Sequence, residues 1–118
     1  MWFYIIIIYA YIHIYLNRGV SMRQYENEEI LLHTSEFFKA LSDYSRLKIV
    51  SSLLNNELCV SDICKKVEMS QTAVSYQLKL LRQMHLVKYR RSGQNVFYSI
   101  DDQHVYDIIT KAIDHIKE

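Results

Sequence analysis

Four side chains near the carboxyl end of the chain have the chemistry to bind a metal ion. They are Asp102, His104, His115 and Glu118. Imidazole nitrogens and carboxylate oxygens are common zinc ligands. On a helix, His115 and Glu118 share a face, whereas His104 and His115 are separated by about three turns, or roughly 16 Å along the axis. One metal ion therefore cannot contact both histidines of a single chain.

Two copies of this segment, packed as antiparallel helices, would bring the four ligands together. The beginning of one helix then meets the end of the other. Each end of the pair collects Asp102 and His104 from one copy and His115 and Glu118 from the other. This arrangement predicts two tetrahedral zinc sites per dimer. The alternative is structural: Asp102 only caps the helix, both histidines are interface residues, and Glu118 is a frayed end.

A second group of polar side chains lies in residues 70–82 and has the character of a DNA-reading helix face. Small hydrogen-bonding groups come first and can approach base edges, while the later basic groups can meet phosphates. The alternative is an ordinary solvated helix face. The group consists of Ser70, Gln71, Thr72, Ser75, Tyr76, Lys79 and Arg82.

The apolar spacing in residues 60–82 predicts the two helices that hold this face. Residues 68–70 make a tight turn between them, and Ser70 is a good N-cap because its hydroxyl can accept a bond from a free first-turn amide. The pattern is that of a helix-turn-helix. Its apolar positions are Val60, Ile63, Cys64 and Val67 in the first helix, and Val74, Leu78 and Leu81 in the second.

Residues on both sides complete the predicted fold. Helices are expected over 25–41 and about 44–54, with Asp43 as the cap of the second. Residues 86–90 and 95–100 are rich in β-branched and aromatic types and flank residues 91–94, which predicts a β-hairpin. Arg90 and Arg91 are expected at its tip, where they can reach a DNA backbone or minor groove. A helix-turn-helix followed by a basic hairpin is a winged helix, so the fold class is mostly α with one β-hairpin.

The final helix, expected over 102–117, has an apolar face too broad for one neighbour. In a domain this small, a partner subunit is the expected cover, and a two-fold dimer also matches palindromic operators. The apolar residues are Val105, Ile108, Ile109, Ala112, Ile113 and Ile116.

Length and composition agree with one small DNA-binding domain. The 118 residues are 50% hydrophobic and contain no proline and two glycines, which favours a mostly helical chain. Net charge is only +1, but seven cations lie between Lys65 and Arg91 against Glu68 alone, as expected of a phosphate-facing surface. Two cysteines fit a reducing cytoplasm. An enzyme is not expected, because there is no glycine-rich phosphate loop and four protein ligands leave zinc no open position.

Residues 1–21 form a hydrophobic leader that differs from the rest of the chain. Residues 1–16 are apolar or aromatic except for His13. This stretch is shorter than the roughly 20 residues that a membrane-spanning helix needs. It also lacks the basic n-region and the cleavage motif of a signal peptide. Isoleucine and tyrosine favour strand over helix. The preferred interpretation is that Met22 is the working start and that residues 22–118 are the domain, without stable membrane association. The alternative is a short anchor, with Arg18 and Arg23 on the cytoplasmic side.

Residues 22–118 closely resemble the ArsR/SmtB family of bacterial metal-sensing repressors, specifically the SmtB-like and CzrA-like zinc sensors. The resemblance is carried by three stretches. They are FFKALSDYSR at 37–46, MSQTAVSYQLKLL at 69–81, and LVK at 86–88 running into YSIDD at 98–102.

The resemblance implies a ligand set and a mechanism. In such sensors the last helix carries Asp-x-His, then His-x-x-His or His-x-x-Glu, and residues 102–104 and 115–118 match the version that ends in glutamate. It also implies that the metal-free homodimer holds double-stranded operator DNA. Binding of Zn(II), with Co(II) as an alternative metal, then lowers DNA affinity and releases genes for efflux or sequestration.

Two departures from the family pattern leave other functions open. Cys59 matches the first cysteine of the thiol-based Cys-x-Cys branch, but Ser61 replaces the second, while Cys64 is expected in the core; Tyr76 stands where many relatives have histidine. One alternative is a winged-helix repressor that responds to thiol redox or soft metals through Cys59 and Cys64, although the two point about 140° apart on a helix. Another is a membrane-tethered interaction module that uses residues 1–21.

Overall fold

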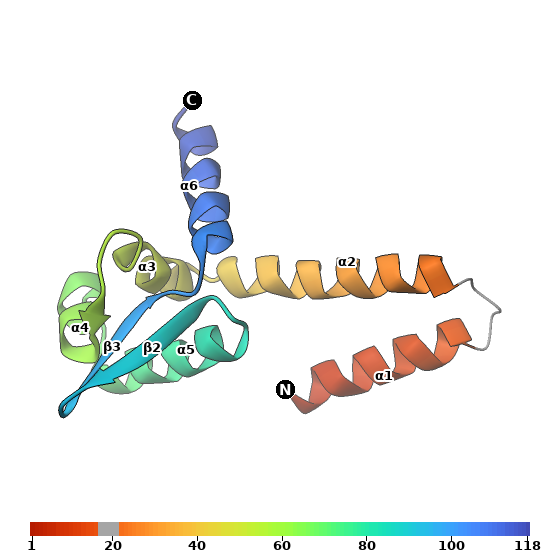
Figure 1. The fold of residues 1–118 in the computed structure, drawn as a ribbon, viewed down its shortest axis with the longest axis horizontal. Coiled ribbons are helices and arrows are strands. Elements are labelled where there is room, and N and C mark those ends of the chain that lie inside the picture. Colours follow the sequence, from red (N-terminus) through yellow and green to blue (C-terminus); the bar gives the residue numbers. More distant parts are fainter. Residues whose placement is uncertain (17–21) are drawn as a thin grey trace. The chain divides into compact units, whose positions relative to one another are not determined.

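The computed structural model describes the backbone of residues 1–16 and 22–118, with their side chains apart from those of 11, 13–16 and 22–26. Arg18 and the side chain of Arg23, invoked above for a short anchor, lie outside the described residues. The chain divides into two compact units, Met1–Glu36 and Phe37–Glu118. The first contains α1 (Trp2–Leu16) and most of α2 (Met22–Leu41), and the second contains the end of α2 and all later elements (Figure 1).

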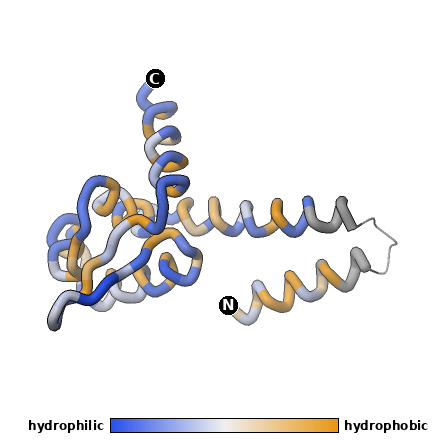
Figure 2. Tube along the Cα trace, viewed as in Figure 1, coloured by the Kyte–Doolittle hydropathy of each residue, from blue (hydrophilic) through white to orange (hydrophobic). Residues whose placement is uncertain are grey.

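Helix α1 differs from the strand preference of its residue types. A segment that pairs with no strand can still satisfy its backbone groups internally by forming a helix, and this segment does so. Its large side chains are exposed, with Trp2 at 80% and Phe3 at 81%, and hydrophobic residues run along most of the helix (Figure 2). Within residues 1–16 and 22–118, no helix is both long enough and apolar enough to cross a membrane.

The predicted helix-turn-helix and its caps are confirmed. Helix α3 (Tyr44–Ser52) begins after Asp43, whose carboxylate accepts a 3.0 Å hydrogen bond from the Arg46 N–H. Helices α4 (Val60–Val67) and α5 (Gln71–Gln83) follow, and Ser70 caps α5 by accepting a 3.2 Å bond from the Ala73 N–H. These caps satisfy first-turn amides that have no partner inside the helix.

The turn between α4 and α5 depends on one unusual backbone conformation. Glu68 adopts a left-handed conformation with φ of 56°, and its N–H bonds to the Cys64 carbonyl. Helices commonly end with such a residue, usually glycine, because a side chain is strained there. The chain therefore turns sharply into α5 at the cost of some backbone strain.

The hairpin is confirmed, but its turn is shorter than predicted. Strands β2 (Val87–Ser92) and β3 (Asn95–Ile100) are antiparallel, and only Gly93 and Gln94 connect them, so Arg91 and Ser92 belong to β2. A further strand, β1 (Leu58–Cys59), pairs with β3 to give the order β1-β3-β2. Sequence reasoning missed β1 because two residues are too few to show an alternating pattern.

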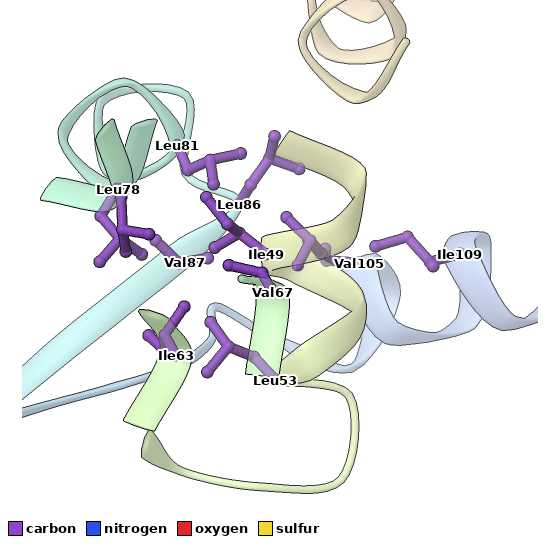
Figure 3. Close-up of a cluster of buried hydrophobic side chains, with 12 residues drawn as sticks. Ile49, Leu53, Ile63, Val67, Leu78, Leu81, Leu86, Val87, Val105 and Ile109 are labelled. Carbon is purple, nitrogen blue, oxygen red and sulfur yellow. The ribbon is translucent and has the colours of Figure 1, made fainter. Parts of the chain in front are cut away.

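The core joins the three helices around the turn to the hairpin and to α6 (Gln103–Lys117). Ile49 of α3 meets Leu53, which directly follows that helix, together with Ile63 and Val67 of α4 and Leu78 and Leu81 of α5 (Figure 3). Burying one such side chain contributes about 1.5–3 kcal/mol. Val87 of β2 and Leu86 just before it, with Val105 and Ile109 of α6, close the cluster. The architecture is a winged helix-turn-helix, with α5 and the hairpin held on a common core.

Candidate DNA-reading surface and metal ligands

The predicted polar face of α5 is exposed along its whole length. The opposite face is fixed by Val74, Leu78 and Leu81, which are at most 1% exposed. Because these three positions orient the helix, the polar side chains of the opposite face point outward. The exposed residues are Ser70, Gln71, Thr72, Ser75, Tyr76, Lys79 and Arg82.

The end of α5 is attached to the hairpin through an aromatic contact. The Arg82 guanidinium carbon lies 4.8 Å from the centre of the Tyr89 ring on β2. The Tyr89 ring in turn lies 6.0 Å from the ring of Tyr98, its partner on β3. A cation over an aromatic face is attracted by the ring quadrupole. Tyr89 therefore marks the face of β2 that packs toward α5.

The prediction that both arginines lie at the tip of the hairpin is wrong, because Arg90 and Arg91 are paired within β2. Arg90 pairs with Phe97 and Arg91 with Val96, whereas Ser92 and Asn95 form the last pair before the turn. Successive side chains of a strand point to opposite faces. Arg91 therefore shares the face of Tyr89, and Arg90 lies on the other face.

Arg90 is held by an ion pair that sequence reasoning missed. Its Nε donates to both carboxylate oxygens of Glu57 at 2.9 Å, and its Nη2 also contacts Glu57. The guanidinium carbon lies 5.0 Å from the centre of the Phe97 ring. The hydrogen bond from Arg90 lowers the pKa of Glu57, and the same bond raises the pKa of Arg90. Both groups are therefore kept charged.

Asp102 and His104 meet at the beginning of α6. One carboxylate oxygen of Asp102 accepts a 3.0 Å bond from the Val105 N–H and so caps the helix, while the other lies 3.7 Å from Nδ1 of His104. The Val105 hydrogen bond, aided by His104, lowers the pKa of Asp102. Two ligands of one tetrahedral zinc are about 3.3 Å apart when each bond is 2.0–2.1 Å. The pair therefore fits half of such a site, and the 91% exposed side chain of His104 leaves room for further ligands.

His115 and Glu118 lie at the other end of α6. His115 is in the last turn, and the Glu118 N–H bonds to the His115 carbonyl at 3.3 Å as the helix ends. The length of the helix separates this pair from Asp102 and His104, as the spacing predicted. Across the part of the chain that is described, no three His, Cys, Asp or Glu side chains gather where one ion could sit. A single chain thus brings the four predicted ligands together only in pairs.

An apolar groove of about 590 Å³ lies along α6, facing the end of α2 and the beginning of α3. Val105 and Ile109 are buried in the core, but Ile108 is 38% exposed and Ile116 is 83% exposed. The predicted broad apolar face of α6 is therefore only half covered within one chain. The groove is lined mainly by Phe38, Leu41, Leu47, Ile108, Ala112 and Ile116.

The two cysteines are free and have different environments. Cys64 is half-buried and packs against the core, as predicted. The Cys59 thiol donates a 3.3 Å hydrogen bond to a carboxylate oxygen of Asp62 and lies 3.2 Å from the Ser61 hydroxyl. The sequence analysis did not predict a role for Asp62. The signal that could have indicated this contact is a cysteine just before a helix with an acidic residue three positions later.

Comparisons with known proteins agree with this geometry. Residues 43–89 match the family model described as bacterial regulatory protein, arsR family. A transcriptional repressor SmtB homologue from Synechocystis is 49% identical over 84 residues, which are 71% of this chain and 64% of that protein. A cadmium resistance transcriptional regulatory protein, the CadC homologue of Staphylococcus aureus, is 42% identical over 74% of this chain and 73% of its own length.

The fold also matches a solved structure. A homodimeric winged helix-turn-helix DNA-binding domain of a possible ArsR-family regulator from Mycobacterium bovis superposes with a TM-score of 0.76. The two chains are 28% identical, and the match covers 85% of this chain and 90% of that one.

Proposed function

The chain belongs to the ArsR family of bacterial regulatory proteins, and from that premise we propose that it is a cytoplasmic transcriptional repressor that releases its operator when Zn(II) binds. The active form in this proposal is a homodimer of residues 22–118. The observation that supports it is the arrangement of α6, which has a pair of residues of metal-binding type at each end and a half-covered apolar face between them.

The DNA part of the proposal rests on α5. Its outward face offers Ser75 and Tyr76 to base edges in a major groove, while Lys79 and Arg82 further along can contact phosphates. Ser70, Gln71 and Thr72 stand at the helix N-terminus, where small polar side chains and free amides can approach the DNA closely. The hairpin beside α5 adds a basic side chain that can contact the sugar-phosphate backbone of the DNA.

The metal part of the proposal rests on pairing two copies of α6. An antiparallel pair would cover the groove and set Asp102 and His104 of one copy beside His115 and Glu118 of the other. Bound Zn(II) would supply a tetrahedral link between two subunits. For this link to release DNA, zinc must bind more tightly to the DNA-free arrangement of the dimer, and DNA must then weaken zinc binding by the same factor. Co(II) accepts the same ligands and is the alternative metal.

The direct test is fluorescence anisotropy of the full chain on DNA from its own promoter, titrated with zinc under reducing conditions. Binding without metal and release near one zinc per protomer are expected. Binding that zinc leaves unchanged would overturn the metal part and leave the DNA part standing. No binding to promoter DNA, from a protein with a cooperative thermal transition, would overturn the repressor itself.

A second candidate is favoured by the contact between Cys59 and Asp62. The Cys59 thiol is a ligand that soft metals prefer and also a site for oxidation, and the Asp62 carboxylate, 3.3 Å away, can add a harder oxygen ligand to the same ion. A repressor released by cadmium or by an oxidant, and not by zinc, would follow from this pair. The Cys59→Ser variant separates the candidates, because it abolishes that response and leaves a response through α6 intact.

The role of residues 1–21 depends on where the cell begins translation. We propose that translation begins at Met22 and that the leader has no part in repression. Intact-mass measurement of the endogenous protein tests this, since a mass that includes residues 1–21 would instead favour a tethered protein.

A further inference from the structure

We propose that the two neighbouring arginines of the hairpin have separate tasks: Arg90 is a positioning residue that fixes the hairpin to β1 through Glu57, and of the two only Arg91 contacts DNA phosphate. This inference rests on the proposed DNA binding and assigns different roles in it to two adjacent residues.

The first support is the alternation of side chains along β2. Val87 is buried in the core and Tyr89 packs on Arg82 of α5, so this face of the strand is turned toward the helix that carries the DNA-reading surface. Arg91 is two residues after Tyr89 and lies on the same face. Its side chain is exposed and, within the described residues, makes no ion pair or hydrogen bond. Its charge is therefore free for a phosphate beside the groove that α5 would enter.

The second support is the different environment of Arg90. The fork of its guanidinium is already filled by the Glu57 carboxylate, and its flat side lies over the ring of Phe97. Phe97 also faces Cys59 across the β1–β3 pairing, so Arg90, Phe97 and Cys59 form one row across the three strands. Glu57 directly precedes β1. The ion pair therefore joins the two edge strands across the middle one and restrains the hairpin relative to the helices.

The experiment measures operator affinity over a series of salt concentrations. Each phosphate contact contributes about 0.9 to the slope of log affinity against log salt. Arg91→Gln should make the salt dependence shallower, reducing the magnitude of the slope by about 1.8 for a dimer that uses both hairpins. Arg90→Gln and Glu57→Gln should leave the slope unchanged and weaken operator binding only about two- to fivefold, as expected from the loss of an exposed ion pair.

The matched control exchanges the two charges. In Glu57→Arg with Arg90→Glu, the net charge is that of the wild type and the ion pair can form in reverse. This double variant should bind more tightly than either single reversal and keep the wild-type slope. The proposal would be overturned if the double variant bound the operator more weakly than both single reversals. It would also be overturned if Arg90→Gln reduced the magnitude of the salt slope as much as Arg91→Gln does.

Hydrogen exchange of the DNA-free protein tests the positioning role independently. Amides of β2 and β3 should exchange faster in Glu57→Gln and Arg90→Gln and return toward wild-type rates in the charge exchange. Unchanged exchange in both single variants would refute the role of Glu57 even if DNA binding were altered. A wild-type protein that bound no DNA would instead defeat the proposed function and the task of Arg91, and exchange would still decide the task of Arg90.

Discussion

Asp102 and His104 meet in the first turn of α6, with one carboxylate oxygen of Asp102 3.7 Å from Nδ1 of His104. The other oxygen caps the helix by accepting from the Val105 N–H. Capping and ligation therefore do not compete in this carboxylate, because each uses a different oxygen. The structural interpretation of Asp102 as a cap and the proposed metal site are compatible.

Substitutions of Asp102 should separate these two tasks. An asparagine at this position would retain a capping oxygen, since asparagine is as good an N-cap as aspartate, but it lacks the negative charge that a zinc ligand supplies. Asp102→Asn should keep the thermal midpoint near that of the wild type and lower zinc affinity by more than about tenfold. Asp102→Ala should lower both. Circular dichroism melts and competition with a chromogenic chelator measure the two effects, and equal zinc affinity in all three proteins would remove Asp102 from the ligand set.

The cap should also give stability a dependence on pH. Because folding lowers the pKa of Asp102 below its ordinary value of 3.8, the stabilisation is fully present above that value and is lost as pH falls through the lowered pKa. The difference in urea midpoint between the wild type and Asp102→Ala should be constant from about pH 7 to 5 and should shrink below about pH 4. A difference that persisted unchanged at about pH 2 would show that the ionised carboxylate is not what stabilises the helix.

Loss of a histidine should remove the response to zinc and spare DNA binding. His104 and His115 lie on α6, away from the exposed face of α5, so His104→Ala or His115→Ala should bind promoter DNA as the wild type does and fail to release it with zinc. Anisotropy titrations measure both properties. Cys59→Ser is the control that should still respond, and release of either histidine variant at the wild-type zinc concentration would argue against the α6 site.

Changes on the outward face of α5 should act in the opposite way. Ser75→Ala and Tyr76→Ala should each weaken specific operator binding by about 1–3 kcal/mol, the value of a good base contact, with zinc stoichiometry unchanged. Lys111→Ala on α6 is an exposed control outside this face. Competition with unrelated DNA measures specificity, and operator affinity equal to that of the control would mean that these side chains do not contact bases.

The left-handed turn at Glu68 should respond to glycine. Glycine has no Cβ to strain at a φ of 56°, so Glu68→Gly should raise the free energy of unfolding by up to about 1 kcal/mol. Glu68→Ala removes the same charge but keeps the Cβ, and it should give no such gain. Urea denaturation compares the three proteins, and equal stability of the glycine and alanine variants would show that the backbone at this position is relaxed.

Local patterns predicted most of the fold, because caps and apolar spacing are short-range features. Asp43 and Ser70 cap the predicted helices, and Val74, Leu78 and Leu81 orient α5 as their spacing required. The partner of Arg90 could not be found in this way. Glu57 is 33 residues distant and reaches Arg90 only because β1 joins the sheet.

The predicted ligands show the same limit. Their positions at the two ends of α6 followed from counting turns along one helix, and the structure has them there. Their assembly into one site requires a second copy, and the geometry of that pairing depends on contacts outside a single chain. Helix α1 departs from the strand preference of its residue types for a related reason, since that preference favours a strand only where a neighbouring strand is available to pair with.

The half-covered groove along α6 has a consequence for how much of this protein a cell needs. If a second copy covers it, the population of paired chains depends on the square of the free protomer concentration. Operator occupancy then falls more steeply than abundance when the protein is diluted by growth or removed by proteolysis. The dosage of the chain would thereby become a regulatory input of its own, separate from any metal.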